Sequence, residues 1–100
     1  MARPPVGRWF TVNLILAVYK GTRRKWFTKR MLEHYYYALK NHLDGDAPSW
    51  KTVENNLAIL QREGLLEKSF IRGHRHRLQV YVIKPRFWQE VRKWMTLASE

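Results

Sequence analysis

The stretch "TVENNLAILQREGLLEK", residues 52–68, is the most informative part of the sequence for the fold. Its apolar residues Val53, Leu57 and Leu60 recur at three- and four-residue spacing, which is typical of a helix with one buried face. Gly64 follows at a position where helices commonly end. After it, the hydrophobic period changes. The stretch therefore predicts a helix that leads directly into extended structure.

Downstream of this helix the sequence predicts a β-hairpin and a closing helix. "LLEKSFI" (65–71) and "RLQVYVI" (77–83) are rich in β-branched and aromatic residues, and the glycine-containing "RGHRH" (72–76) separates them as a basic tip. Pro85 suits the first position of a helix over 85–98. One broad apolar stripe on that helix is made of Phe87, Trp88, Val91, Trp94, Met95 and Ala98.

Upstream, three more elements are predicted, together with their caps. Ser49 is a good N-cap for the helix over 50–63, with Trp50 on its inner face. Thr28 is a good N-cap for an amphipathic helix over 29–43, whose inner face is expected to hold Met31, Leu32, Tyr35, Leu39, His42 and Leu43.

The N-terminal part predicts a buried helix and a short strand. Residues 8–19 are apolar almost all round a helix, and Gly21 is a natural stop for it. Trp26 and Phe27 suit a very short strand. Residues 1–7 are expected to form a flexible basic arm, 8–84 the core of a single domain, and 85–98 its C-terminal helix.

The charge of the chain favours a polyanionic partner. The chain has 19 Lys and Arg against 8 Asp and Glu, a net charge of +11. The excess is concentrated in residues 1–43, which hold nine basic residues and one acidic residue. Neutralising phosphates with such a field releases condensed counterions. Nucleic acid is therefore the expected partner, and a solvated basic surface is the alternative.

Other features of the composition narrow the classes of protein. The absence of cysteine excludes disulfides, thiolate metal sites and thiol nucleophiles. The longest apolar run, "WFTVNLILAVY", is too short to span a bilayer, and no secretion signal is visible. We therefore expect a cytoplasmic protein without a membrane partner, and the sequence indicates no cofactor and no small-molecule ligand.

The predicted order of helix, short strand, helix, helix, hairpin and helix resembles that of winged helix-turn-helix DNA-binding domains. The segment "TVENNLAILQREGLLEK" is similar to the recognition helix of that family and its junction with the wing. The resemblance implies a mainly α fold, namely a three-helix core with a small β-hairpin wing, here with an additional C-terminal helix. One departure is "HLDGDAPS", which is longer than the turn of a tight helix-turn-helix.

The resemblance also implies a function and a set of site residues. The helix over 50–63 is expected in the DNA major groove, and the hairpin tip on phosphates or the adjacent minor groove. The chain would then be a sequence-preferring double-stranded DNA-binding protein, a transcriptional regulator. The side chains whose chemistry suits base reading are Lys51, Thr52, Asn55, Asn56 and Arg62.

The charges of Lys51 and Arg62 on this helix are nearly cancelled by those of Glu54 and Glu63. Phosphate contacts are therefore expected mainly from two basic clusters around the helix. Backbone contacts are assigned to Arg23, Arg24, Lys25, Thr28, Lys29, Arg30, Tyr37 and Ser49, several of them at a helix N-terminus. Wing contacts are assigned to Arg72, His74, Arg75, His76 and Arg77. Protonation of the two histidines would make binding tighten as the pH falls toward about 6.

Sharper chemical interpretations have less support. His74 and His76 suggest a metal site, but a third ligand is missing and the neighbouring arginines oppose a cation. "HRH" with "YYY" resembles DNA-nicking replication initiators, but Arg75 stands where those enzymes have a bulky apolar residue. No catalytic constellation is visible, so an enzyme is not expected. The five tryptophans favour the core over base stacking, with Trp50 left open.

The assembly and the exact partner stay open at the level of sequence. The apolar first and last helices suggest a homodimer formed through them, and the alternative is that these two helices pack on each other within one chain. Rival functions are an RNA- or ribosome-associated winged helix, an interaction module in a replication or partition complex, and a non-specific chromosome-coating protein. All of these rivals except the interaction module share the basic surface.

Overall fold

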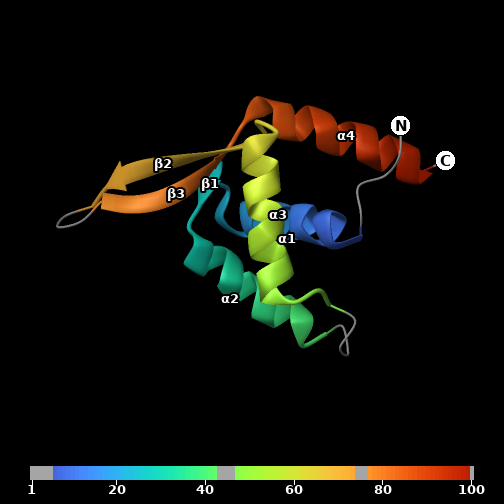
Figure 1. The fold of residues 1–100 in the computed structure, drawn as a ribbon, viewed down its shortest axis with the longest axis horizontal. Coiled ribbons are helices and arrows are strands. Elements are labelled where there is room, and N and C mark those ends of the chain that lie inside the picture. Colours follow the sequence, from blue (N-terminus) through green and yellow to red (C-terminus); the bar gives the residue numbers. More distant parts are fainter. Residues whose placement is uncertain (1–5, 43–46, 74–76, 100) are drawn as a thin grey trace.

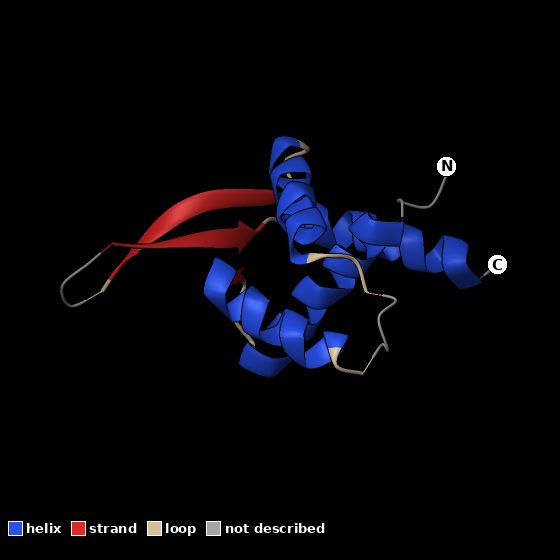
Figure 2. Ribbon diagram, turned by 60° about the horizontal axis from the view of Figure 1, so that its bottom comes forward, coloured by secondary structure: helices blue, strands red, loops and turns tan. Residues whose placement is uncertain are grey.

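The fold is mainly helical with a small antiparallel sheet, as Figures 1 and 2 show. The computed structural model describes residues 6–42, 47–73 and 77–99. These ranges contain four helices and one three-stranded sheet. None of these helices has the length and apolar character needed to cross a membrane. The elements are α1 (Val6–Thr22), β1 (Trp26–Phe27), α2 (Lys29–Lys40), α3 (Trp50–Arg62), β2 (Leu66–Arg72), β3 (Arg77–Ile83) and α4 (Pro85–Ser99). Each lies where the sequence predicts an element of that type.

Helix α1 is mostly apolar because other elements cover most of its surface, whereas Asn13 and Lys20 are exposed. It packs against α2, α3 and β1, and the buried side chains Val12, Ile15 and Val18 lie in the main core. Its contact with α4 is aromatic: the ring centroids of Trp9 and Trp94 are 6.1 Å apart, and those of Tyr19 and Trp88 are 4.8 Å apart. The first and last helices therefore contact each other within one chain. The contact uses the apolar surfaces that, from the sequence, could also have formed a homodimer.

The end of α1 differs from the prediction. Gly21 lies inside the helix, which continues to Thr22, so the expectation that Gly21 stops it is wrong. A side chain at position 21 would collide with the hydroxyl of Tyr35, so the glycine leaves room for that side chain of α2. Arg23 ends the helix in the left-handed conformation, with φ of 60°. Its backbone N–H donates to the carbonyl of Tyr19 at 2.7 Å.

Helix α2 begins as predicted and ends early. The hydroxyl of Thr28 accepts from the backbone N–H of Met31 at 3.0 Å, which confirms the N-cap. The helix ends at Lys40, because the N–H of His42 turns back to the carbonyl of Leu39 at 3.0 Å and tightens the last turn. His42 is exposed, so its predicted place on the inner face is wrong, and Leu43 lies outside the described residues.

Helix α3 has the predicted cap at each end. The hydroxyl of Ser49 accepts from the N–H of Thr52 at 3.2 Å. At the other end Gly64 has φ of +80°, and the N–H groups of Gly64 and Leu65 return to the carbonyls of Gln61 and Leu60 at 3.1 and 2.9 Å. This left-handed ending reverses the chain and directs it into β2.

The sheet has the order β1-β3-β2, and all pairs are antiparallel. Leu66 pairs with Ile83 at the base of the hairpin, and Arg72 pairs with Arg77 at its outer end. Phe27 of β1 pairs with Tyr81 and stacks on its ring at 5.4 Å, on the face of the sheet that joins the core. The hairpin projects from the helical body beyond this base (Figure 1).

Candidate nucleic-acid interface

Helix α3 presents a polar stripe to solvent on the side opposite its buried residues. Val53, Leu57 and Leu60 are buried in the core and fix the rotation of the helix. Positions 51, 55, 58 and 62 repeat at helical spacing on the other side, and all four are exposed. Lys51, Asn55 and Arg62 are therefore directed away from the protein, as expected for side chains that contact a ligand; we call them the α3 stripe.

Two of the predicted base-reading side chains are occupied elsewhere. Asn56 is only 8% exposed, and its amide nitrogen donates to the carbonyl of Thr52 at 3.0 Å, so its assignment to base reading is corrected. Thr52 is half-buried, and its hydroxyl is 3.0 Å from that of Ser49. Both side chains face the first turn of α1, where a Cβ on Gly7 would stand 3.1 Å from the Thr52 methyl group and 3.4 Å from the Asn56 amide nitrogen.

The N-terminus of α2 lies beside α3. The ammonium of Lys29 is 3.2 Å from the carboxylate of Glu54, and this ion pair joins the two helices. Helix geometry leaves the backbone N–H groups of Lys29 and Arg30 without intrahelical acceptors. Together with the positive end of the helix dipole they favour an anion at this position.

The hairpin adds a basic face whose base lies beside α3. Its register puts Lys68, Phe70, Arg72, Arg77 and Gln79 on one face, continuous at the base with the buried pair Leu66 and Ile83. We call these five side chains the basic hairpin face. Lys68 lines the same shallow hollow as Gln61 of α3, so the base of this face lies beside the last turn of the helix.

Arg72 and Arg77 are direct cross-strand partners on the basic hairpin face. Both are exposed, and neither has an ion-pair partner among the described residues. Like charges directly opposite each other destabilise a sheet unless an anion lies between them. The pair is therefore a source of like-charge repulsion in the free protein.

Glu54 of α3 and its C-cap residue Glu63 do not cancel the cations of the helix. Glu54 pairs with Lys29 of α2, and Glu63 pairs with Arg8 of α1 at 3.2 Å. Lys51 and Arg62 therefore keep their charge toward solvent, unlike the near-cancellation suggested by the sequence. The remaining ion pairs within the described ranges are Lys84–Glu67 at 3.0 Å and Lys93–Glu90 at 3.6 Å.

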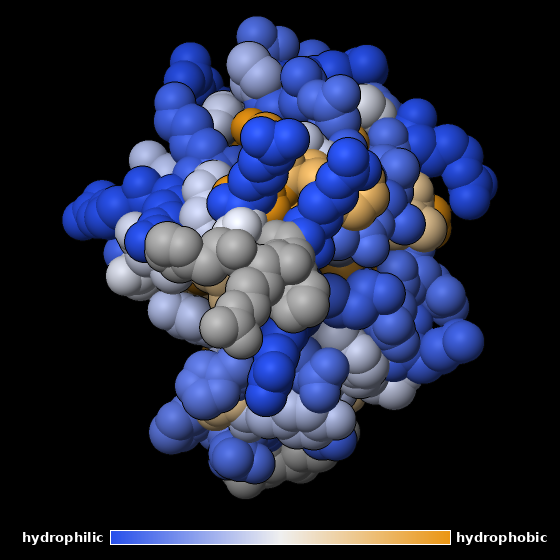
Figure 3. Space-filling view, turned by 90° about the vertical axis from the view of Figure 1, so that its left-hand side faces the viewer, coloured by the Kyte–Doolittle hydropathy of each residue, from blue (hydrophilic) through white to orange (hydrophobic). Residues whose placement is uncertain are grey.

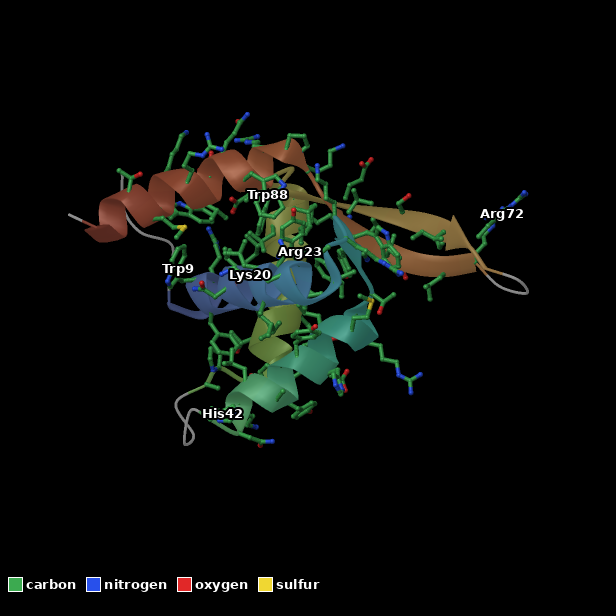
Figure 4. The ribbon with its side chains drawn as sticks, turned by 180° about the vertical axis from the view of Figure 1, so that it is seen from behind. Trp9, Lys20, Arg23, His42, Arg72 and Trp88 are labelled. Carbon is green, nitrogen blue, oxygen red and sulfur yellow. The ribbon has the colours of Figure 1, made fainter. Side chains whose placement is uncertain are left out.

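Two residues of the predicted cluster over 23–25, Arg23 and Arg24, are not brought to the α3 stripe. The guanidinium of Arg24 lies 5.0 Å from the centroid of the Trp26 ring. Because Trp26 and Phe27 are neighbours on a strand, Trp26 faces away from the core side of the sheet. Figure 4 shows Lys20 and Arg23 on the side of α1 that is turned away from α3, and Arg72 at the far end of the hairpin.

Other predicted contacts lie at the edges of this surface or outside the described residues. Arg30 and the exposed Tyr37 line a shallow hollow on the outer face of α2 with His34 and Asn41. Arg72 and Arg77 frame the hairpin tip, whereas the predicted contacts His74, Arg75 and His76 lie outside the described residues. Figure 3, which looks at the hairpin from its tip, shows projecting hydrophilic side chains with apolar surface between them.

The tryptophans and the metal hypothesis also have a structural context. Trp94 is buried in the core, and Trp9, Trp50 and Trp88 pack against the core. The ring of Trp26 contacts the guanidinium of Arg24 on the outer face of the sheet. Trp50, left open as a base-stacking residue, packs on Tyr36 with ring centroids 5.4 Å apart. In the part of the chain that is described, no three potential metal ligands gather.

Sequence reasoning missed Lys68, Phe70 and Gln79 as interface candidates. The alternation of Leu66, Lys68, Phe70 and Arg72 along one strand would have put Lys68 and Phe70 on the face of Arg72.

Comparison with models of protein families, with curated proteins and with solved structures finds no match to this chain.

Proposed function

We propose that the chain is a winged helix protein that binds double-stranded DNA with sequence preference, as a transcriptional regulator. In this proposal α3 enters the major groove, the N-terminus of α2 binds the backbone, and the hairpin contacts the flanking backbone or minor groove. The observation that carries the proposal is the exposed α3 stripe, on which Lys51 and Arg62 flank Asn55, because Glu54 and the C-cap residue Glu63 are already paired with Lys29 and Arg8.

The chemistry of each part supports a division between positioning and reading. Asn55 can donate to and accept from an adenine edge, and Lys51 and Arg62 can reach guanine or phosphate. Lys68, Arg72 and Arg77 offer point and forked charges to phosphates. An α-helix with its side chains is about 10–12 Å wide, which fits a major groove about 12 Å wide.

A titration with fluorescent duplex DNA tests the proposal, with two arginine variants as a matched pair. Arg62→Gln removes a cation from the α3 stripe, and Arg92→Gln removes an exposed cation from α4. We expect Arg62→Gln to weaken binding by about 1–3 kcal/mol and Arg92→Gln to leave it almost unchanged.

Competition distinguishes duplex DNA from the other polyanions. At fixed salt, unlabelled duplex DNA is expected to displace the probe at lower concentration than structured RNA or single strands. Preference for RNA would transfer the function to an RNA-binding protein. Equal losses in the two arginine variants would show that α3 is not the contact surface.

A further inference from the structure

A large apolar side chain is exposed in the middle of the basic hairpin face. Phe70 is 60% exposed, more than any other large hydrophobic residue that the structure describes. It lies opposite Gln79, between Lys68 on one side and the Arg72–Arg77 pair on the other. Alternate residues of a strand are about 7 Å apart, so cations stand within one side-chain length of the ring on both sides.

The exposure of Phe70 is not explained by the packing of the hairpin. Tyr81, on the same face, stacks on Phe27 and belongs to the core, whereas Phe70 is outside the core cluster. None of the ring contacts among the described residues involves Phe70. Leu78, which is 47% exposed, lies on the opposite face of the hairpin and provides an internal comparison.

We propose that Phe70 is a wedge that enters the minor groove of bound DNA, separates two stacked base pairs and bends the duplex. This inference rests on the proposed function. Apolar side chains inserted in this way unstack a base step and kink DNA by about 20–90°, and the bend brings more backbone onto the protein. Arg72 and Arg77 would hold phosphates beyond the kink, and Lys68 those on the side of α3.

The neighbours of Phe70 favour a duplex over a single strand as the ligand. Proteins that bind single strands stack successive bases on several aromatic rings along a basic groove. The described part of this face offers one exposed ring, because Tyr81 is buried. Gln79 beside it has a side-chain amide of the kind that reads minor-groove base edges.

A short duplex with a donor dye at one end and an acceptor dye at the other tests the wedge. Fluorescence anisotropy reports binding, and energy transfer between the dyes reports bending, both on the same samples. The proteins compared are the wild type, Phe70→Ala, Phe70→Leu and the opposite-face control Leu78→Ala, each first shown to unfold cooperatively on heating.

The wild type and Leu78→Ala are expected to raise both signals. Phe70→Ala should still bind, within about tenfold of the wild-type affinity because the cations remain, but without the rise in energy transfer. Phe70→Leu, which keeps an apolar wedge, should restore most of the bend.

The two readouts separate failure of the wedge from failure of the proposed function. Wild-type bending by Phe70→Ala, or equal loss of bending in Leu78→Ala, would overturn the wedge while DNA binding stands. A wild type that binds without bending would overturn it as well. Tighter Phe70-dependent binding to single strands would replace the duplex as the ligand of this face. Absence of any rise in anisotropy would reject both proposals.

Discussion

Replacing Arg77 by Gln is expected to stabilise the free protein while weakening its binding to DNA. Arg77 and Arg72 are direct cross-strand partners on one face of the hairpin. Among the residues that the structure describes, neither forms an ion pair with an acidic side chain. Relieving repulsion between two exposed like charges contributes a few tenths of a kcal/mol. For a domain of this size that corresponds to a rise in Tm of roughly 1–3 °C.

The effect of the same substitution on DNA binding has the opposite sign. Each phosphate contact contributes about 0.9 to the slope of log affinity against log salt. Loss of the Arg77 contact should reduce that slope by about 0.9, so that between roughly 50 and 200 mM salt the variant loses about threefold less affinity than the wild type. At low salt its binding should be weaker than that of the wild type.

Thermal unfolding and anisotropy titrations at several salt concentrations measure the two effects. Lys93→Gln is the matched control, because Lys93 pairs with Glu90 at 3.6 Å on α4 and lies outside the proposed interface. It should lower Tm slightly, if at all, and leave the salt slope unchanged. If Arg77→Gln lowers Tm, or leaves the salt slope at its wild-type value, the reasoning from the arginine pair is refuted.

Four further substitutions test individual contacts. Asn55→Ala should reduce binding to a preferred site by about 1–3 kcal/mol and hardly affect binding to random DNA. Asn56→Ala should instead lower the unfolding free energy by about 1 kcal/mol. Urea denaturation and titration with both DNAs measure the two effects, and equal behaviour of the two variants would contradict the assignment. Tyr36→Phe removes the 2.7 Å hydrogen bond to the carbonyl of Pro48 from a ring that is 1% exposed. It should lower the unfolding free energy measured by urea denaturation by about 1 kcal/mol, and an unchanged value would argue against that bond. Trp94→Ala should destabilise the protein by about 3–5 kcal/mol, and a loss below about 1 kcal/mol would show that α4 does not pack on α1 as described.

The parts of the fold that depend on local signals were predictable from sequence. Thr28 and Ser49 cap α2 and α3, and Gly64 ends α3, because each effect involves only neighbouring backbone groups. The hairpin strands and the α3 stripe follow from periods of two and of about 3.6 residues. The end of α2 was misplaced because a tight last turn left no mark in the hydrophobic pattern.

The candidate site was less predictable because it depends on contacts between distant segments. Asn56 is buried because the first turn of α1 approaches at Gly7, and this approach is not visible in the sequence around Asn56. The charge of α3 depends on which residues neutralise Glu54 and Glu63, and those residues come from α2 and α1. Arg23, Arg24 and Lys25 were assigned to the interface by their charge and their place before a helix N-terminus, and the chain direction after α1 takes Arg23 and Arg24 to another side.

A two-dimensional amide NMR titration of the labelled protein with a short duplex tests the central claim most directly. If α3 lies in the groove, the largest shifts should fall on residues of α3 from Lys51 to Arg62, on the first turn of α2, and on the basic hairpin face. Amides of α4 and of residues 20–25 should change little. The largest shifts on α4 or on residues 20–25, with α3 unaffected, would contradict the account.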